Sequence, residues 1–87
     1  MKLPLNYAIL LYFTKHEEGS ADSVIEELNP EYSRYRAFSK RGVIESLMTS
    51  KENGILEEVR TELAGEDELR VWYRLTEYGA DLIKRFL

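Results

Sequence analysis

The chain has 87 residues, of which 44% are hydrophobic and 32% are charged, and its formal net charge at pH 7 is −4. This length suits one domain with a single modest core over residues 1–87, and no apolar run reaches the roughly 18 residues that a membrane-spanning helix needs. The absence of cysteine excludes a disulfide framework and a thiolate metal site, and it indicates an intracellular, cytoplasmic protein.

The first predicted helix spans Leu3 to His16. Pro4 suits its first turn, where the missing amide is no loss. The apolar residues follow helical spacing and form one wide face: Leu5, Ala8, Ile9, Leu11, Tyr12 and Phe13. We interpret His16 as a surface residue, because no second histidine and no cysteine is present to build a catalytic or metal site with it.

A short second helix is predicted after the turn at Glu17-Glu18-Gly19. Ser20 or Asp22 can cap its N-terminus. Its buried side consists of Ala21, Val24, Ile25 and Leu28. Asn29-Pro30 is predicted to end the helix, because the residue before a proline is disfavoured in the helical region.

The connector between Asn29 and Phe38 is longer than the three or four residues that usually join the helices of a helix-turn-helix. It must form a loop or an added helical turn; alternatively, the third helix begins near Ser33. Arg34 and Arg36 alternate here with the aromatic residues Tyr32, Tyr35 and Phe38. We expect the aromatic residues to anchor the connector to the core, while the arginines either contact phosphate groups or stay in solvent.

The stretch from Ser39 to Leu56 predicts a third helix followed by a strand. Ser39 is a suitable N-cap, and Gly54 can end the helix in the left-handed conformation. Four apolar residues predict one buried stripe: Val43, Ile44, Leu47 and Met48. The remaining surface carries Lys40, Arg41, Glu45, Ser46 and Thr49. Residues 29–51 hold five basic and two acidic side chains, whereas the segments before and after them are net negative. This pattern predicts a recognition helix.

A β-hairpin is predicted next, with strands from Ile55 to Leu63 and from Leu69 to Leu75. Alternation places Ile55, Val59 and Leu63 on one face of the first strand and Leu69, Val71, Tyr73 and Leu75 inward on the second. A register that pairs Leu63 with Leu69 puts Arg70 beside Glu62, Trp72 beside Arg60 and Arg74 beside Glu58. We therefore interpret these arginines as a self-paired sheet surface rather than as a basic patch for a ligand.

The last predicted helix runs from Glu77 to Phe86, with Thr76 as its N-cap. Its apolar side consists of Tyr78, Leu82, Ile83 and Phe86. The chain stops at Phe86-Leu87, and these two large apolar residues either pack into the core or contact a second copy of the chain.

The order helix-helix-helix-strand-strand-helix resembles the winged helix-turn-helix regulators of the PadR and MarR type, an α+β fold. The resemblance rests on the spacing of Ser39, Val43, Leu47 and Gly54-Ile55-Leu56. It rests also on Tyr73-Arg74-Leu75-Thr76-Glu77-Tyr78-Gly79, which is close to the Y-x-L-T-x-x-G that follows the wing in many of these proteins. It covers nearly the whole chain. It implies that the helix after Ser39 enters the major groove of DNA and that residues 64–68 form the wing tip.

The first functional hypothesis is a DNA-binding transcriptional regulator whose partner is double-stranded DNA. The candidate DNA-binding residues are Arg34, Arg36, Lys40, Arg41, Gly42, Ser46 and Thr49. A homodimer through the terminal helices would double the contacts. The alternative is a winged-helix adaptor that binds protein without DNA, favoured by the net negative charge, the acidic turn Glu66-Asp67-Glu68 and the apolar C-terminus.

An enzyme is the least favoured class. The chain has one histidine, no cysteine, no glycine-rich phosphate loop after a strand and no pair of histidines for a metal. No catalytic residue, cofactor or metal is predicted.

Overall fold

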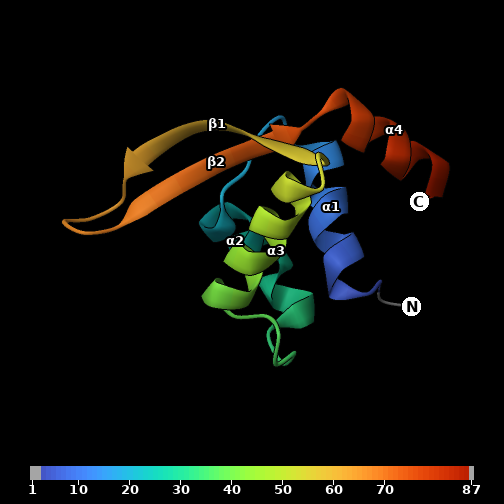
Figure 1. The fold of residues 1–87 in the computed structure, drawn as a ribbon. Coiled ribbons are helices and arrows are strands. Elements are labelled where there is room, and N and C mark those ends of the chain that lie inside the picture. Colours follow the sequence, from blue (N-terminus) through green and yellow to red (C-terminus); the bar gives the residue numbers. More distant parts are fainter. Residues whose placement is uncertain (1–2, 87) are drawn as a thin grey trace.

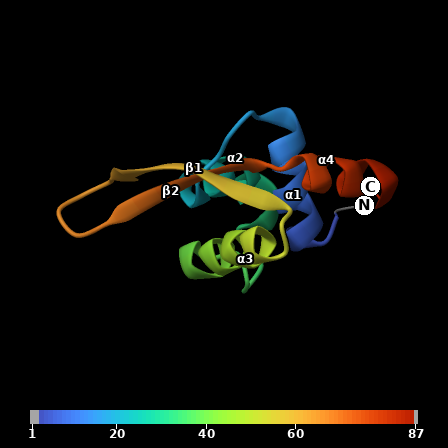
Figure 2. The same cartoon turned by 45° about the horizontal axis from the view of Figure 1, so that its top comes forward.

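The computed structural model describes residues 3–86 and has the predicted order of elements (Figure 1). The elements are α1 (Leu5–Lys15), α2 (Ala21–Tyr32), α3 (Lys40–Glu52), β1 (Leu56–Leu63), β2 (Leu69–Leu75) and α4 (Glu77–Phe86). The first three helices pack together, and the antiparallel β1–β2 hairpin extends past them on one side. α4 lies at the opposite end, beside α1 (Figures 1 and 2).

The core lies where the three helices meet the inner end of the hairpin. Its buried residues are Ile9, Tyr12, Phe13, Val24, Val43, Leu47, Leu56 and Tyr73. All of them except Leu56 belong to the apolar faces predicted for their elements. The core therefore fixes α3 against both α1 and the base of the hairpin.

The predicted helix caps are present. The Ser20 hydroxyl accepts a hydrogen bond from the Ser23 amide at 3.3 Å, and the Ser23 hydroxyl accepts one from the Ser20 amide at 2.9 Å. The Ser39 hydroxyl accepts from the Gly42 amide at 3.0 Å. Gly54 ends α3 with φ of +78°, a left-handed conformation that glycine adopts without steric cost. α1 starts at Leu5 rather than Leu3, because Pro4 takes the N-cap position.

Side-chain hydrogen bonds of Thr76, the residue between β2 and α4, attach the start of α4 to the turn that ends α3. The Thr76 hydroxyl donates to the Gly54 carbonyl oxygen at 2.5 Å and accepts from the Gly79 amide at 2.9 Å, so the predicted cap is confirmed. A Cβ atom on Gly79 would lie 2.2 Å from the Ile55 carbonyl oxygen. The threonine and the glycine of this segment are therefore explained by the close approach of α4 to the backbone at Ile55.

The prediction that α2 ends at Asn29-Pro30 is wrong. α2 continues through Pro30 to Tyr32, and the Ser33 amide donates to the Asn29 carbonyl oxygen at 3.0 Å. Pro30 removes one helical hydrogen bond, that of the Glu26 carbonyl. Both Glu26 and Pro30 are exposed, so water can satisfy that carbonyl. The connector thus contains an added helical turn, and the alternative start of α3 near Ser33 is wrong because α3 begins at Lys40.

The hairpin register is confirmed at its outer end and shifted at its inner end. Leu63 pairs with Leu69, Glu62 with Arg70 and Arg60 with Trp72. A bulge between Glu58 and Arg60 then shifts the register, so Arg74 lies opposite Glu57 and not opposite Glu58 as predicted. A bulge adds one residue to one strand, which a strict alternation of side chains does not reveal.

The predicted inner face of the hairpin is buried only near the helices. Tyr73 is buried and Val71 half-buried, but Leu69 is 65% exposed and Leu63 is 74% exposed. Val59, at the bulge, is also exposed. These side chains are exposed because the outer half of the hairpin extends beyond the helices that would cover it (Figure 1).

The C-terminal helix leaves an aromatic residue in solvent. Phe86 is 74% exposed, so it does not pack into the core, and Leu87 lies outside the described residues. None of the helices within residues 3–86 combines the length and the apolar character that crossing a bilayer requires.

Candidate nucleic-acid interface

The outer face of α3 is polar. Val43 and Leu47 are buried on the inner side, while Arg41, Glu45 and Thr49, spaced four residues apart, lie in one exposed row. The Arg41 guanidinium donates to the Glu45 carboxylate at 3.4 Å, and the two side chains are 90% and 66% exposed. An ion pair this exposed adds little stability, so Arg41 can take another partner without disturbing the fold.

Two arginines lie in the loop that leads into α3. Arg34 and Arg36 are exposed, and neither has an ion-pair partner among residues 3–86. Two of the three predicted aromatic anchors are confirmed: Tyr32, the last residue of α2, is buried and its hydroxyl donates to the Leu3 carbonyl oxygen at 2.5 Å, and Phe38 is half-buried. Tyr35 is 43% exposed, and its ring centre lies 5.0 Å from that of Tyr32. Contact between these arginines and phosphate groups stays a prediction.

Gly42 and Ser46 face the protein more than the solvent. A Cβ atom on Gly42 would lie 2.3 Å from the Ala37 carbonyl oxygen, so glycine is needed where the loop backbone crosses α3. The Ser46 hydroxyl donates to the Asn6 side-chain oxygen of α1 at 3.2 Å. Both residues therefore fix the position of α3 relative to its neighbours.

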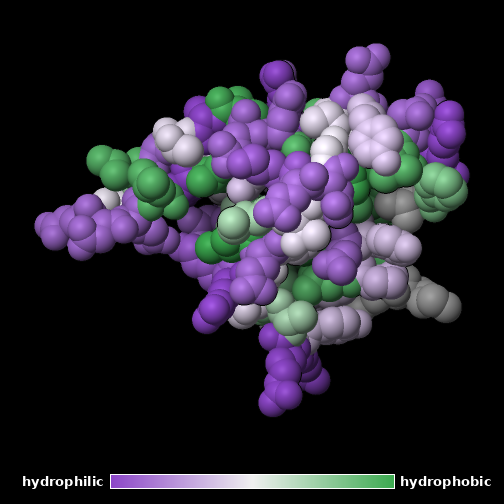
Figure 3. Space-filling model, viewed as in Figure 1, coloured by the Kyte–Doolittle hydropathy of each residue, from purple (hydrophilic) through white to green (hydrophobic). Residues whose placement is uncertain are grey.

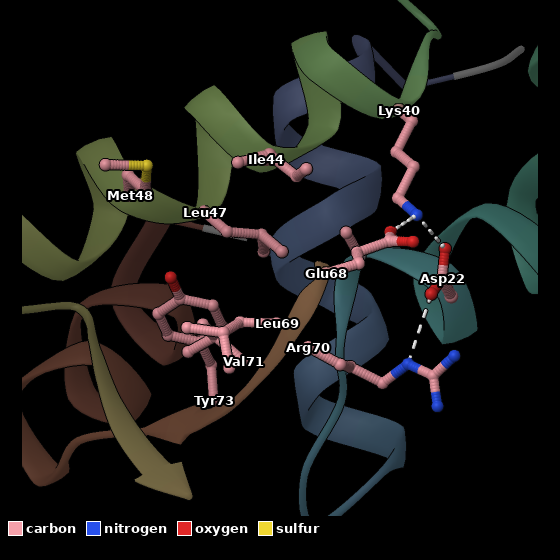
Figure 4. Close-up of a pocket in the computed structure, with 11 residues that line it drawn as sticks. Asp22, Lys40, Ile44, Leu47, Met48, Glu68, Leu69, Arg70, Val71 and Tyr73 are labelled. Carbon is pink, nitrogen blue, oxygen red and sulfur yellow. Dashed lines mark hydrogen bonds and ion pairs between the residues drawn. The ribbon is translucent and has the colours of Figure 1, made fainter. Parts of the chain in front are cut away.

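Lys40 belongs to an ion-pair network that links α3, α2 and the hairpin (Figure 4). Its ammonium donates to the Glu68 carboxylate and lies 3.3 Å from the Asp22 carboxylate, which also accepts from Arg70 at 3.1 Å. Partial burial disfavours ionised Asp22, but the hydrogen bonds from Lys40 and Arg70 outweigh it and lower the pKa of this carboxyl below 3.8. The hydrogen bonds to Glu68 and Asp22 raise the pKa of Lys40. Lys40 thus faces the hairpin rather than the exposed row of α3.

The three hairpin arginines are all paired, and the predicted contacts of Arg70 with Glu62 and of Arg60 with Trp72 are confirmed, whereas Arg74 pairs with Glu57 rather than Glu58. Arg60 lies 2.7 Å from Glu18, Arg70 lies 3.2 Å from Glu62, and Arg74 lies 2.7 Å from Glu57. The Arg60 guanidinium also lies 4.4 Å from the centre of the Trp72 ring, whose indole nitrogen donates to Glu62 at 2.8 Å. These charges are satisfied within the molecule.

No protein-family model matches the sequence, and no curated protein sequence matches it significantly. Solved structures do match: PadR from Bacillus subtilis, solved in complex with operator DNA, is 22% identical with a TM-score of 0.74 over 94% of this chain. The chain has a winged-helix fold. A PadR-like transcription factor from Bacteroides fragilis gives a TM-score of 0.72 at 22% identity over 93% of the chain. A zinc-responsive MarR family member from Lactococcus lactis gives 0.61 at 20% identity over 97%.

The match leaves part of these proteins uncovered. The chain spans 45% of the Bacillus subtilis PadR chain, 74% of the Bacteroides fragilis chain and 51% of the Lactococcus lactis chain. The resemblance to PadR-like and MarR-family regulators therefore holds for the winged-helix fold, in which the β1–β2 hairpin is the wing.

The tip of this wing is acidic. Glu68 pairs with Lys40, whereas Glu66 and Asp67 have no ion-pair partner in the described part of the chain. Negative side chains are repelled by a phosphate backbone. The cations available for such a backbone therefore lie on α3 and its preceding loop and not on the wing tip.

Sequence reasoning missed one part of this region, the space between α3 and the wing. Ile44 is 38% exposed and Met48 is 50% exposed, so the prediction that both belong to a buried stripe is wrong. A helical pattern shows which residues share a face but not how far the next element stands off from it. No sequence signal linked Asp22 or Glu68 to Lys40 either, because their contacts join segments 18 and 28 residues apart.

The only histidine does not form a metal site with other described residues. The His16 ring nitrogen lies 2.6 Å from the Glu27 carboxylate at the surface, in agreement with the interpretation of His16 as a surface residue. Over residues 3–86, no three histidine, aspartate or glutamate side chains are grouped as metal ligands.

Proposed function

We propose that this chain is a cytoplasmic DNA-binding transcriptional regulator that places α3 in the major groove of double-stranded DNA. The observation that supports this most strongly is the winged-helix fold shared with PadR, a protein whose structure was solved in complex with operator DNA. The exposed polar row on α3 gives the proposal a matching surface.

The proposed contacts come from two elements. Arg41 and Thr49 reach base edges or the flanking phosphates, and Glu45 can accept from a cytosine amino group. Arg34 and Arg36 contact the backbone beside the groove, because phosphate contacts set the register of a protein on DNA.

The other three candidate residues have supporting roles. Gly42 and Ser46 hold α3 against its loop and against α1. Lys40 can reach a phosphate only by leaving Glu68 and Asp22. Its contribution to affinity is therefore smaller than that of Arg41.

We also propose a homodimer through the terminal helices. Tyr7 of α1 and Phe86 of α4 are 48% and 74% exposed, and they border one apolar groove between the two helices. A two-fold dimer would present two α3 helices to the DNA and double the phosphate contacts.

The test measures the affinity of the whole chain for a random DNA duplex by fluorescence anisotropy at two salt concentrations. With three arginines on phosphates, a rise from 50 to 200 mM salt should weaken binding roughly 40-fold per copy. Arg41→Glu should weaken binding about tenfold at the lower salt, since it removes one contact and adds repulsion. Lys15→Glu reverses a different exposed cation, on α1, and serves as the matched control.

Binding that is absent at low salt, or that falls equally for Arg41→Glu and Lys15→Glu, contradicts the proposal. A winged-helix adaptor that binds protein without DNA is the second candidate. It is favoured by the unpaired acidic residues Glu66 and Asp67 at the wing tip, and the absence of any DNA retention would support it.

A further inference from the structure

A cleft with apolar walls opens between α3 and the outer half of the wing. We name it the α3–wing cleft. It has a volume of about 180 Å³. Ile44 and Met48 line it from α3, and Leu69 and Val71 line it from β2 (Figure 4). Its floor is the buried core at Leu47 and Tyr73.

The apolar walls continue onto the open wing. Leu69 is 65% exposed, and Leu63, its partner across the hairpin, is 74% exposed. Figure 3 shows hydrophobic side chains on the wing outside the helical body. Contiguous exposed apolar surface of this kind marks an interaction site more often than isolated apolar residues do.

The charged side chains that line the cleft balance one another, and further acidic side chains lie beyond its two ends. Lys40 and Arg70 lie at one end, but their charges are taken up by Asp22, Glu68 and Glu62. Three acidic side chains beyond the ends of the cleft have no ion-pair partner within residues 3–86: Glu66 and Asp67, which precede Glu68 at the wing tip, and Glu52, which lines a neighbouring pocket together with Met48. Apolar walls flanked by these carboxylates do not suit a phosphate backbone.

We propose that the α3–wing cleft is a docking site for a protein segment that presents apolar side chains flanked by lysines or arginines. The apolar side chains would fill the cleft, and the cations would pair with Glu66, Asp67 and Glu52. A second copy of this chain is less suited, because the chain itself carries a net charge of −4. The inference goes beyond DNA binding and holds whether or not α3 enters a groove.

The test uses a synthetic helical peptide with leucine on one face and lysine elsewhere. It is titrated into the isotopically labelled whole chain and followed by NMR. The largest shifts are expected at Ile44, Met48, Leu69 and Val71. Two control peptides separate the contributions: one replaces each lysine by glutamate, and the other replaces each leucine by serine. Each control should bind at least about tenfold more weakly.

Variants of the chain locate the site. Leu69→Ser should weaken binding of the leucine-lysine peptide about fivefold, since it removes an exposed apolar wall. Asp67→Lys should weaken it about threefold, as expected for reversal of one surface charge. Tyr78→Ser, at a side chain that is 59% exposed on α4, and Glu26→Lys, on α2, are the matched controls and should leave binding unchanged. Met48→Ser is a second variant in case Leu69→Ser perturbs folding.

Three results would overturn the inference. The peptide shifts could spread over the acidic surface without a maximum at the cleft, or both Leu69→Ser and Met48→Ser could bind the peptide like the parent chain. Sedimentation could instead show self-association that Leu69→Ser abolishes, which would make a second copy the occupant. DNA binding is measured separately with Arg41→Glu, so failure of either proposal is recognised on its own.

Discussion

The arginines of the loop before α3 and those of the wing have opposite surroundings. Arg34 and Arg36 lie in solvent with no ion-pair partner in the described chain. Arg60 and Arg70 bind the acidic residues Glu18 and Asp22, and thereby attach the wing to the helical body. Two regions with similar numbers of cations therefore differ in what the charge does: one leaves it available to a ligand, and the other uses it within the fold.

The largest expected difference in stability between the two regions concerns a glycine beside the loop, Gly42, and a glycine on the wing tip, Gly65. Gly42→Ala should lower the free energy of unfolding by about 1–3 kcal/mol, because the new Cβ would meet the Ala37 carbonyl oxygen at 2.3 Å. A loss of stability in this variant would be diagnostic, because alanine normally stabilises a helix interior by about 1 kcal/mol relative to glycine. Gly65→Ala, on the wing tip, has nothing within 4 Å of its Cβ and should be near neutral. Urea unfolding of both variants measures the difference; equal stabilities would contradict the close packing of loop and helix.

A second test separates available charge from paired charge. Arg34→Ala/Arg36→Ala should reduce the slope of log affinity against log salt for duplex DNA by about 2 and weaken binding roughly tenfold. The thermal stability of this double variant should not change, because neither side chain makes an ion pair with another residue of the range 3–86. Arg74→Ala removes the 2.7 Å contact with Glu57, which is exposed to solvent, so it should lower stability only slightly and leave the salt slope unchanged. The distinction fails if the two variants change DNA binding to the same extent.

The smallest expected effect concerns the network that attaches the wing to α2 and α3. The pKa of Asp22 is lower in the folded chain than its ordinary value of 3.8, so its ion pairs stabilise the fold above that pH. This stabilisation is lost as the pH falls through the lowered folded pKa. Asp22→Asn should therefore be less stable than the parent at pH 7, by up to about 1 kcal/mol, and the difference should shrink as the pH falls through the lowered pKa of Asp22. A difference that persists or grows in acid would contradict the network.

Local features of the fold could be predicted well from the sequence. Ser20, Ser39 and Thr76 cap their helices, and Gly54 ends α3, because each feature depends on residues only a few positions apart. The pairing of Leu63 with Leu69 also followed from a short turn and the alternation beside it.

Features that depend on distant segments could not be predicted. The bulge near Val59 shifted Arg74 to Glu57, and the exposure of Met48 depends on how far the wing stands off from α3. For the candidate interface, the sequence indicated the basic segment and the exposed Arg41. It gave no sign that Lys40 is held by Asp22 and Glu68, since burial and charge pairing are set by the packing of separate elements.

The central claim is that DNA contacts the exposed row of α3 and its preceding loop, and not the acidic wing tip. The most direct measurement is an NMR titration of the labelled whole chain with a random duplex at low salt. We predict the largest shifts in residues 33–49, with Glu66 and Asp67 of the wing tip unaffected. Maximal shifts at residues 64–68, or no shifts anywhere in the chain, would contradict the account.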